Sequence, residues 1–352
     1  MTLLWDNGPD IDQIKADIAD GWITQRWHPD MPLQLLNYSH RCQGKQHWTT
    51  ETKACRGLIL DVDWNVVQRP FGKFFNLGEP DCPQIPNEPF EVYEKIDGNL
   101  GILYWNGDWP SIATRGSFTS WQAVAATRYI RMTALWKNKW VKLMRRDWTY
   151  VFEYIHPDNR IVVDYGSSES LHLLAVLNTK TGQDIPWDRT DYVRLPFPVV
   201  VEHPSDTNVN EPRENREGYV IRYKSGLRVK VKHDEYVYLH RLVTQMTPRV
   251  IWELMKGGAP VDQIVEDAPE QFREWVHLQA DAIRVTYDVI ESDVAREYAL
   301  RPETTDRKAL AAYITQCRHP AVMFAMLDSK PYAEIIWKMI KPEPASPYRI
   351  EV

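Results

Sequence analysis

Lys95 stands in the run E-K-I-D-G, where Asp97 and Gly98 follow it after one intervening residue. This spacing is typical of a lysine that attacks the α-phosphate of a nucleotide. The attack needs a neutral amine, so we expect neighbouring cations to depress the pKa of Lys95. It also needs a glycine that lets a phosphate approach the backbone. A chain of this length holds such a tetrad by chance about one time in ten, so the alternative is a solvated lysine before an ordinary turn.

Two further lysines belong to a predicted hairpin in the run EGYVIRYKSGLRVKVK. A three-residue turn at K-S-G would pair Val220 with Lys230 and Gly218 with Lys232, leaving Glu217 at the same end of the hairpin. Because residues i and i+2 of a strand point to one face, both lysines can meet an α-phosphate. Glu217 would position a metal, a water or the nucleophile. The alternative is the charged, solvated face of an edge strand.

Cations suited to a polyphosphate come from other segments. A predicted hairpin with its turn at W-N brings Arg56 opposite Lys73, and a guanidinium fork beside a compact ammonium suits β and γ phosphates. Arg115, directly before a predicted helix, could contact another phosphate. On a short predicted strand, Glu153 could accept ribose hydroxyls or hold magnesium-bound waters. The alternative interpretation of the three cations is that they are ordinary surface residues.

The elements that must position these residues change type once along the chain. Up to about residue 240, β-branched and aromatic runs separated by turn dipeptides, such as GILYWNGDWPSIATRG, predict antiparallel hairpins. One amphipathic helix is predicted from about Ser120 to Arg146. Beyond residue 240, Gly and Pro signals separate helical pieces without strand alternation. We therefore predict an α+β fold, with an antiparallel-sheet domain at 1–240 and an all-α domain at 241–352.

Composition limits the possible functions. With 42 basic and 48 acidic residues the net charge is -6, which argues against a protein that coats nucleic acid by bulk charge, although a local basic groove stays possible. The four cysteines are scattered without C-x-x-C, so we expect neither zinc nor disulfides and predict a reducing, cytoplasmic location. No apolar run is long enough to span a bilayer, and we expect no membrane contact.

Taken in order, ACRGLIL, KFFNLGE, EKIDGNLG, ATRGSFTSWQA, FEYIHPDNRIVVDY, EGYVIRY and RVKVKHDEYVYLH resemble the motifs of the phage-type RNA ligase 1 family. This family belongs to the covalent nucleotidyltransferase superfamily, and the resemblance spans about residues 50–240. It implies an ATP-dependent RNA ligase that works in three steps. ATP adenylates a lysine, AMP passes to an RNA 5′-phosphate, and a 3′-hydroxyl then displaces AMP.

The resemblance also implies a role for each matching residue. Arg115 departs from some members, which have lysine there, and this affects only the geometry of that contact. The implied catalytic residues are Lys95, Glu217, Lys230 and Lys232. The implied nucleotide-binding residues are Arg56, Lys73, Phe75, Glu94, Gly98, Arg115, Glu153, Val220 and Tyr236, with Gly218 beside Glu217 in one pocket motif. The residues expected to meet the metal, through water, are Asp97, Glu153 and Glu217.

The expected ligands and partners follow from the same resemblance. ATP is the expected substrate, with Mg²⁺ or Mn²⁺, and RNA with 5′-phosphate and 3′-hydroxyl ends, including tRNA, is the expected partner in RNA repair. We expect a monomer whose helical domain influences the choice of RNA. A basic groove on the helix after Ser120 is an expectation that competes with a solvated helix face. The alternatives are a DNA ligase, a GTP-using capping-type enzyme, or a non-catalytic protein that binds RNA ends. No recognisable OB-fold follows Lys232, which weighs against the first two.

Overall fold

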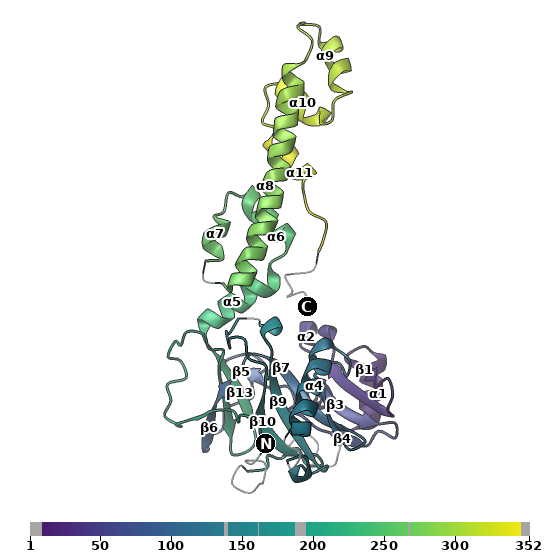
Figure 1. The fold of residues 1–352 in the computed structure, drawn as a ribbon, viewed down its shortest axis with the longest axis vertical. Helices are drawn as coiled ribbons and strands as arrows, with labels where there is room; N and C mark the ends of the chain where they lie inside the picture. Colours follow the sequence, from purple (N-terminus) through teal and green to yellow (C-terminus); the bar gives the residue numbers. More distant parts are fainter. Residues whose placement is uncertain (1–8, 137–139, 161, 187–194, 267, 346–352) are drawn as a thin grey trace. The chain divides into compact units, whose positions relative to one another are not determined.

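The computed structural model describes residues 9–136, 140–160, 162–186, 195–266 and 268–345 (Figure 1). The chain divides into two compact units, residues 1–237 and residues 238–351. Sheets and helices make up the first unit, and its sheets are mainly antiparallel, as the α+β prediction requires.

The N-terminal sheet of the first unit is buried on both faces. Leu36 and Leu58 pack with Ile14 of the first helix on one face. Their neighbours Leu35 and Ile59 pack against the next sheet on the other face, because successive strand residues point to opposite sides. The elements are α1 (Ile11–Ala19), β1 (Ile23–Trp27), β2 (Leu33–Tyr38), α2 (His40–Lys45), α3 (Thr50–Ala54), β3 (Arg56–Asp61) and β4 (Val66–Gln68), with the sheet order β1-β2-β3-β4.

The second sheet carries Glu153 and is covered by the long helix of this unit. Its strands are β7 (Asn99–Asn106), β8 (Trp109–Thr114), β9 (Trp148–Ile155) and β10 (Ser170–Asn178), in the antiparallel order β10-β9-β7-β8. The helix is α4 (Trp121–Trp136), and Ala126 and Ile130 pack with Phe152 in the core beneath it. A short 3-10 turn, η2 (Pro157–Asn159), follows β9.

The predicted helix from about Ser120 to Arg146 is too long. α4 begins after Ser120, whose hydroxyl accepts from the amide of Ala123, but it ends at Trp136. Trp140 is buried in the core and donates its indole N–H to the carbonyl of Thr133 at 3.3 Å. Only a 3-10 turn, η1 (Val141–Leu143), follows. Lys137 and Lys139 lie outside the described residues.

The third sheet contains Lys95, Lys230 and Lys232, and four of its five strands are antiparallel to their neighbours. The strands are β5 (Phe75–Asn76), β6 (Phe90–Lys95), β11 (Glu202–His203), β12 (Gly218–Tyr223) and β13 (Arg228–Lys232), in the order β11-β6-β12-β13-β5. Only β5 pairs in parallel, against β13.

The second unit is built from helices, as far as the described residues reach. The predicted Gly and Pro signals mark helix ends at Gly257, where α6 stops, and at Pro320, where α10 starts. α6 itself starts at Pro248 after its Thr247 cap. A core around Val294, Ile314 and Val322 holds the later helices together. The helices are α5 (Asp234–Gln245, which starts in the first unit), α6 (Pro248–Lys256), α7 (Val261–Ile264), α8 (Glu270–Ala299), α9 (Arg307–Ile314), α10 (Pro320–Leu327) and α11 (Ala333–Met339). None of the described helices is both long and apolar enough to cross a bilayer.

Candidate active site

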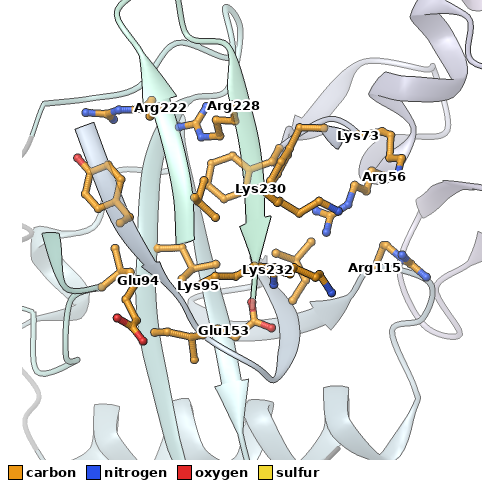
Figure 2. Close-up of a pocket in the computed structure, with 18 of the residues that line it drawn as sticks. Arg56, Lys73, Glu94, Lys95, Arg115, Glu153, Arg222, Arg228, Lys230 and Lys232 are labelled. Atoms are coloured by element: carbon orange, nitrogen blue, oxygen red, sulfur yellow. The ribbon is translucent and has the colours of Figure 1, made fainter. Parts of the chain in front are cut away.

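A cavity lies over one face of the third sheet in the first unit, with walls from the second sheet and the N-terminal segments (Figure 2). Its described lining is strongly cationic, which suits a ligand with several negative charges. The cations are Arg56, Lys73, Lys95, Arg115, Arg222, Arg228, Lys230 and Lys232, and the acidic residues of the lining are Glu94 and Glu153. The lining also includes Tyr38, Phe71, Phe74 and Val220.

The strand register confirms the predicted hairpin and adds a third strand to it. Gly218 pairs with Lys232 and Val220 with Lys230, as predicted. On its other side β12 pairs with β6, where Gly218 faces Lys95. Lys95, Gly218 and Lys232 therefore lie in one row across three strands, which brings two lysines from distant parts of the sequence to the same end of the sheet.

Only glycine fits at the centre of this row. Gly218 has a φ of +142°, and a Cβ atom there would lie 2.0 Å from the carbonyl oxygen of Val231. Side chains are excluded both by the backbone conformation and by this contact. The close packing of β12 on β13 sets the position of Glu217, the residue immediately before.

Glu217 binds both lysines of the row. It is buried, and its two oxygens lie 2.7 Å from Lys95 Nζ and 2.9 Å from Lys232 Nζ. Burial alone would raise the pKa of Glu217, but Lys95 and Lys232 outweigh it and hold the pKa below its ordinary value. The group is therefore a carboxylate that fixes two ammonium groups, in the place where a metal or water contact was predicted.

The expectation that cations depress the pKa of Lys95 is wrong for the free protein. Burial lowers the pKa of Lys95, but the charges of Glu217 and Glu153 raise it by more than burial lowers it. The pKa of Lys95 therefore lies above the ordinary lysine value. Lys95 therefore carries a proton at rest. The sequence could not supply this result, because Glu217 and Glu153 approach Lys95 only in the folded chain.

Lys230 is the lysine that fits the predicted environment. Burial lowers its pKa to about 7, together with the charges of Lys73, Lys95 and Lys232. No carboxylate forms an ion pair with Lys230 in the described parts of the chain, and its Nζ lies 5.6 Å from the centre of the Phe74 ring. An anionic ligand in the cavity would supply the missing counter-charge.

The carboxylate of Asp97, two residues after Lys95, is used in hydrogen bonds within the protein. It is therefore not placed to bind a metal, contrary to the prediction. One carboxylate oxygen accepts from the hydroxyl of Tyr236 at 2.8 Å. The other accepts from the amides of Val162 at 3.3 Å and Val163 at 3.2 Å. The side chain is buried and absent from the described lining of the cavity. Tyr236 is likewise a support: it is buried beneath Lys232, whose Nζ lies 4.8 Å from its ring centre.

The three carboxylates expected to meet a metal do not form one cluster. No group of three or more His, Cys, Asp or Glu side chains is placed to hold a metal ion within the described residues. Glu153 lines the cavity, and its carboxylate forms no hydrogen bond or ion pair with other described residues. Burial raises its pKa to about 8, against the opposing charge of Lys95. The donor set fits a cation that is held mainly by the phosphates of a ligand, as Mg²⁺ commonly is, with Glu153 as the available carboxylate.

Three predicted nucleotide-binding residues have other positions. Phe75 is buried and points away from the cavity, with its ring centre 5.8 Å from that of Trp48, because its neighbour Phe74 takes the lining face. Gly98 is not in the described lining either. A Cβ atom on it would lie 2.5 Å from the carbonyl oxygen of Tyr154, so this glycine allows close packing against β9.

Glu94 is the third of these residues. It belongs to the lining, but its carboxylate accepts from His203 at 2.8 Å and from Arg216 at 2.9 Å. Strand alternation explains this arrangement, since Glu94 directly precedes Lys95 and its side chain leaves the opposite face of β6. Its carboxylate therefore anchors the back of the sheet.

One side of the cavity gathers Arg56, Lys73 and Arg115 (Figure 2). The predicted hairpin does form, but its ladder ends at Gln68 and so does not set Lys73 opposite Arg56. Instead, the amide of Lys73 donates to the carbonyl of Lys53 at 2.6 Å, which returns this loop to the cavity. Nη1 of Arg56 is buried and has no hydrogen-bond partner among the described residues.

Two arginines that line the cavity were not predicted from the sequence. Arg222 and Arg228 face each other across β12 and β13 and share Asp184, which lies 2.9 Å from Nη1 of Arg222 and also pairs with Arg228. The i, i+2 rule that placed Lys230 and Lys232 on one face extends to both arginines, so the signal was present. Tyr38, from β2, had no such signal.

Within the described residues, several cations of the basic helix that was predicted to form an RNA groove already have partners. Arg131 donates to Pro110 and Ser111, Arg145 pairs with Asp147 at 2.7 Å, and Arg146 pairs with Asp108 at 2.8 Å. The last two lie beyond the end of α4, so they do not belong to a helix face. The alternative prediction, a solvated helix face in place of an RNA groove, therefore describes this region better.

Comparison with known proteins agrees with this geometry. The profile of a family described as RNA ligase matches residues 54–238, which include every strand of the third sheet and all the lining residues of the cavity except Tyr38. The RNA ligase of Rhodothermus phage RM378 is 24% identical over 78% of this chain and 81% of its own length. RNA ligase 1 of bacteriophage TS2126 is 30% identical over 36% of this chain, which spans only 35% of that relative. A solved archaeal ATP-dependent RNA ligase has a TM-score of 0.46 and 14% identity over 87% of this chain and 85% of its own.

Proposed function

This chain belongs to the RNA ligase family, and we propose that it is an ATP-dependent enzyme that joins RNA 5′-phosphate and 3′-hydroxyl ends. The observation that carries this proposal is that Glu217 pairs with both Lys95 and Lys232, two lysines that line a cationic cavity. The reaction would proceed through a lysyl-AMP and an RNA-adenylate. Both intermediates use the same cavity.

In the first step, Nζ of Lys95 attacks the α-phosphorus of ATP. A P–N bond forms, the bond to the β-phosphate oxygen breaks, and pyrophosphate leaves on the side opposite Lys95, as in-line displacement requires. Lys230 and Lys232 would stabilise charge on the α-phosphate, while Arg56 and Lys73 would hold the departing phosphates. Because Lys95 is protonated at rest, it must lose a proton before it attacks.

In the second step, an oxygen of the RNA 5′-phosphate attacks the same phosphorus and the P–N bond to Lys95 breaks. In the third step, the RNA 3′-hydroxyl attacks the 5′-phosphate, and AMP leaves with the electrons of the broken bond. Glu217 would hold the released lysine amine in place between steps. Glu153 would meet the ribose or, together with the substrate phosphates, a Mg²⁺ or Mn²⁺ ion that screens their charge.

The biological setting is a further part of the proposal and rests on the family resemblance. We propose that the helical unit influences the choice of RNA, that broken RNA such as tRNA is the substrate in repair, and that the protein acts as a cytoplasmic monomer. The net charge of -6 supports the idea of a local grip on an end over a coating of long RNA.

Intact-mass spectrometry after incubation with ATP and Mg²⁺ tests the proposal directly. We expect one AMP adduct that maps to Lys95, none in a Lys95→Ala variant, and an unchanged adduct in a Lys180→Ala control at an exposed position. Incubation with GTP, and sealing assays with DNA ends, test the capping-type and DNA ligase alternatives. If neither nucleotide gives an adduct, or if Lys95→Ala still seals RNA, the proposed mechanism is wrong.

A further inference from the structure

The stereochemistry of the first step, lysine adenylation, determines the side of the cavity from which the RNA 5′-phosphate attacks in the second step. Pyrophosphate leaves on the side of the α-phosphorus opposite Lys95, and the RNA 5′-phosphate must attack from that same side, because it displaces Lys95 in line. The RNA end therefore enters where the β and γ phosphates had been. In the proposed function, which this inference presupposes, that place is the side of Arg56, Lys73 and Arg115.

Aromatic rings connect this side of the cavity to the surface. Arg115 donates to the hydroxyl of Tyr38 at 3.0 Å, and the ring centre of Tyr38 lies 5.1 Å from that of Trp48. Lys73 Nζ lies 5.1 Å from the same Trp48 ring. Trp48 is half-buried. The segment directly before it in the chain lies at the surface.

The surface segment combines stacked rings with unpaired cations. The imidazole of His47 stacks on the indole of Trp22, with ring centres 4.2 Å apart and an interplanar angle of 20°. The guanidinium of Arg41 lies 4.0 Å from the centre of the Trp22 ring and donates to the carbonyl of Asp20. Arg41 and Lys45 are exposed, and neither forms an ion pair within the described residues. We call this surface, made of Trp22, Arg41, Lys45 and His47, the α2 platform.

The segment that carries Arg41, Lys45 and His47 differs in charge from other segments near the cavity. Residues 38–50 contain Arg41 and Lys45 and no Asp or Glu. The segment 156–169, which follows β9, contains three acidic residues and one arginine, and the segment 200–216 contains four acidic residues and two arginines. An RNA backbone is repelled by the latter two and attracted by the first. Planar guanidinium and ring surfaces also suit unpaired bases.

We propose that the single-stranded RNA whose 5′-phosphate enters the cavity leaves it over the α2 platform. Arg41 and Lys45 contact its backbone phosphates, and a base stacks on the exposed side of the Arg41, Trp22 and His47 stack. The platform thus binds the 5′-phosphorylated strand beyond its terminal nucleotide, and it takes no part in the reaction of Lys95 with ATP.

A double variant, Arg41→Ala with Lys45→Ala, tests the proposal, and Lys180→Ala with Lys224→Ala, two exposed lysines of the same unit, is the matched control. With adenylated enzyme and a 5′-phosphorylated RNA 12-mer, we expect the platform variant to raise the KM of AMP transfer roughly tenfold and to lower the salt slope of RNA binding by about 1.4, the value for two lost phosphate contacts on a single strand. The control should match the unchanged protein.

Two further measurements separate the possible failures. Lysyl-AMP formation should be equal in all three proteins, which also shows that each is folded. A 5′-phosphorylated mononucleotide, which cannot reach the platform, should accept AMP equally from all three. If the unchanged protein forms no lysyl-AMP, the proposed function is wrong. If it does, but the platform variant transfers AMP to the 12-mer as the control does, or loses affinity only for the 3′-hydroxyl strand, the α2 platform does not bind this RNA.

Discussion

Lys95 and the buried Glu217 form an ion pair of 2.7 Å at the point where β6 and β12 meet in register. The pair keeps Lys95 oriented toward the cavity and keeps it protonated, because the carboxylate raises the pKa of the amine. The resting protein is therefore organised but not yet reactive, and loss of a proton has to accompany the reaction with ATP.

Replacing Glu217 should change the pH dependence of lysyl-AMP formation. In Glu217→Gln the pKa of Lys95 should fall, because the burial that lowers it remains while the main opposing charge is gone. The midpoint of the rate against pH, measured at saturating ATP, should therefore move to lower pH. Glu202→Gln, at an exposed position of β11, should leave the midpoint where it is. An unchanged midpoint in Glu217→Gln would mean that another group sets the pKa.

Gly218→Ala should strongly destabilise the first unit. The new Cβ would lie 2.0 Å from the Val231 carbonyl at a φ of +142°, so we expect a loss of about 3 kcal/mol or more in the free energy of unfolding. Gly78→Ala is a suitable control, since Gly78 has a φ of +84° but no atom within 4 Å of the new Cβ; there the loss should be about 1 kcal/mol. Urea denaturation measures both, and equal losses would contradict the steric account.

Two buried tyrosines should respond differently to loss of the hydroxyl group. Tyr236→Phe removes the donor to Asp97 at 2.8 Å and leaves a buried carboxylate oxygen without it, which should cost about 2 kcal/mol. The hydroxyl of Tyr219 is buried without a hydrogen-bond partner among the described residues, so Tyr219→Phe should be neutral or slightly stabilising. Thermal and urea unfolding of both variants test this, and a larger cost for Tyr219→Phe would refute it.

Glu153 should make the protein less stable as the pH rises. Its pKa is about 8 in the folded chain and near 4.5 when unfolded, so between these values the unfolded state releases a proton that the folded state retains. Stability should therefore fall through this window, by at most about 1.4 kcal/mol per pH unit from this group. In Glu153→Gln the fall between pH 5 and 8 should be smaller. Parallel slopes for the two proteins would show that Glu153 ionises normally.

The sequence by itself determined the parts of the site that depend on neighbours along the chain. The hairpin register that pairs Gly218 with Lys232 follows from a turn and a strand pattern, and alternation then places Lys230 and Lys232 on one face. The ordered motifs around Lys95 were sufficient to identify the family. These features are local, so no knowledge of distant contacts was needed.

Tertiary structure decided which of these residues are charged, paired or turned away. Lys95 retains its proton because carboxylates reach it in the folded chain. Lys230 has a pKa of about 7 because it is buried and because other cations surround it. The carboxylate of Asp97 is used by backbone amides and Tyr236, and Phe74 takes the place predicted for Phe75. Charge and burial depend on distances between segments far apart in sequence, and only the folded chain sets those distances.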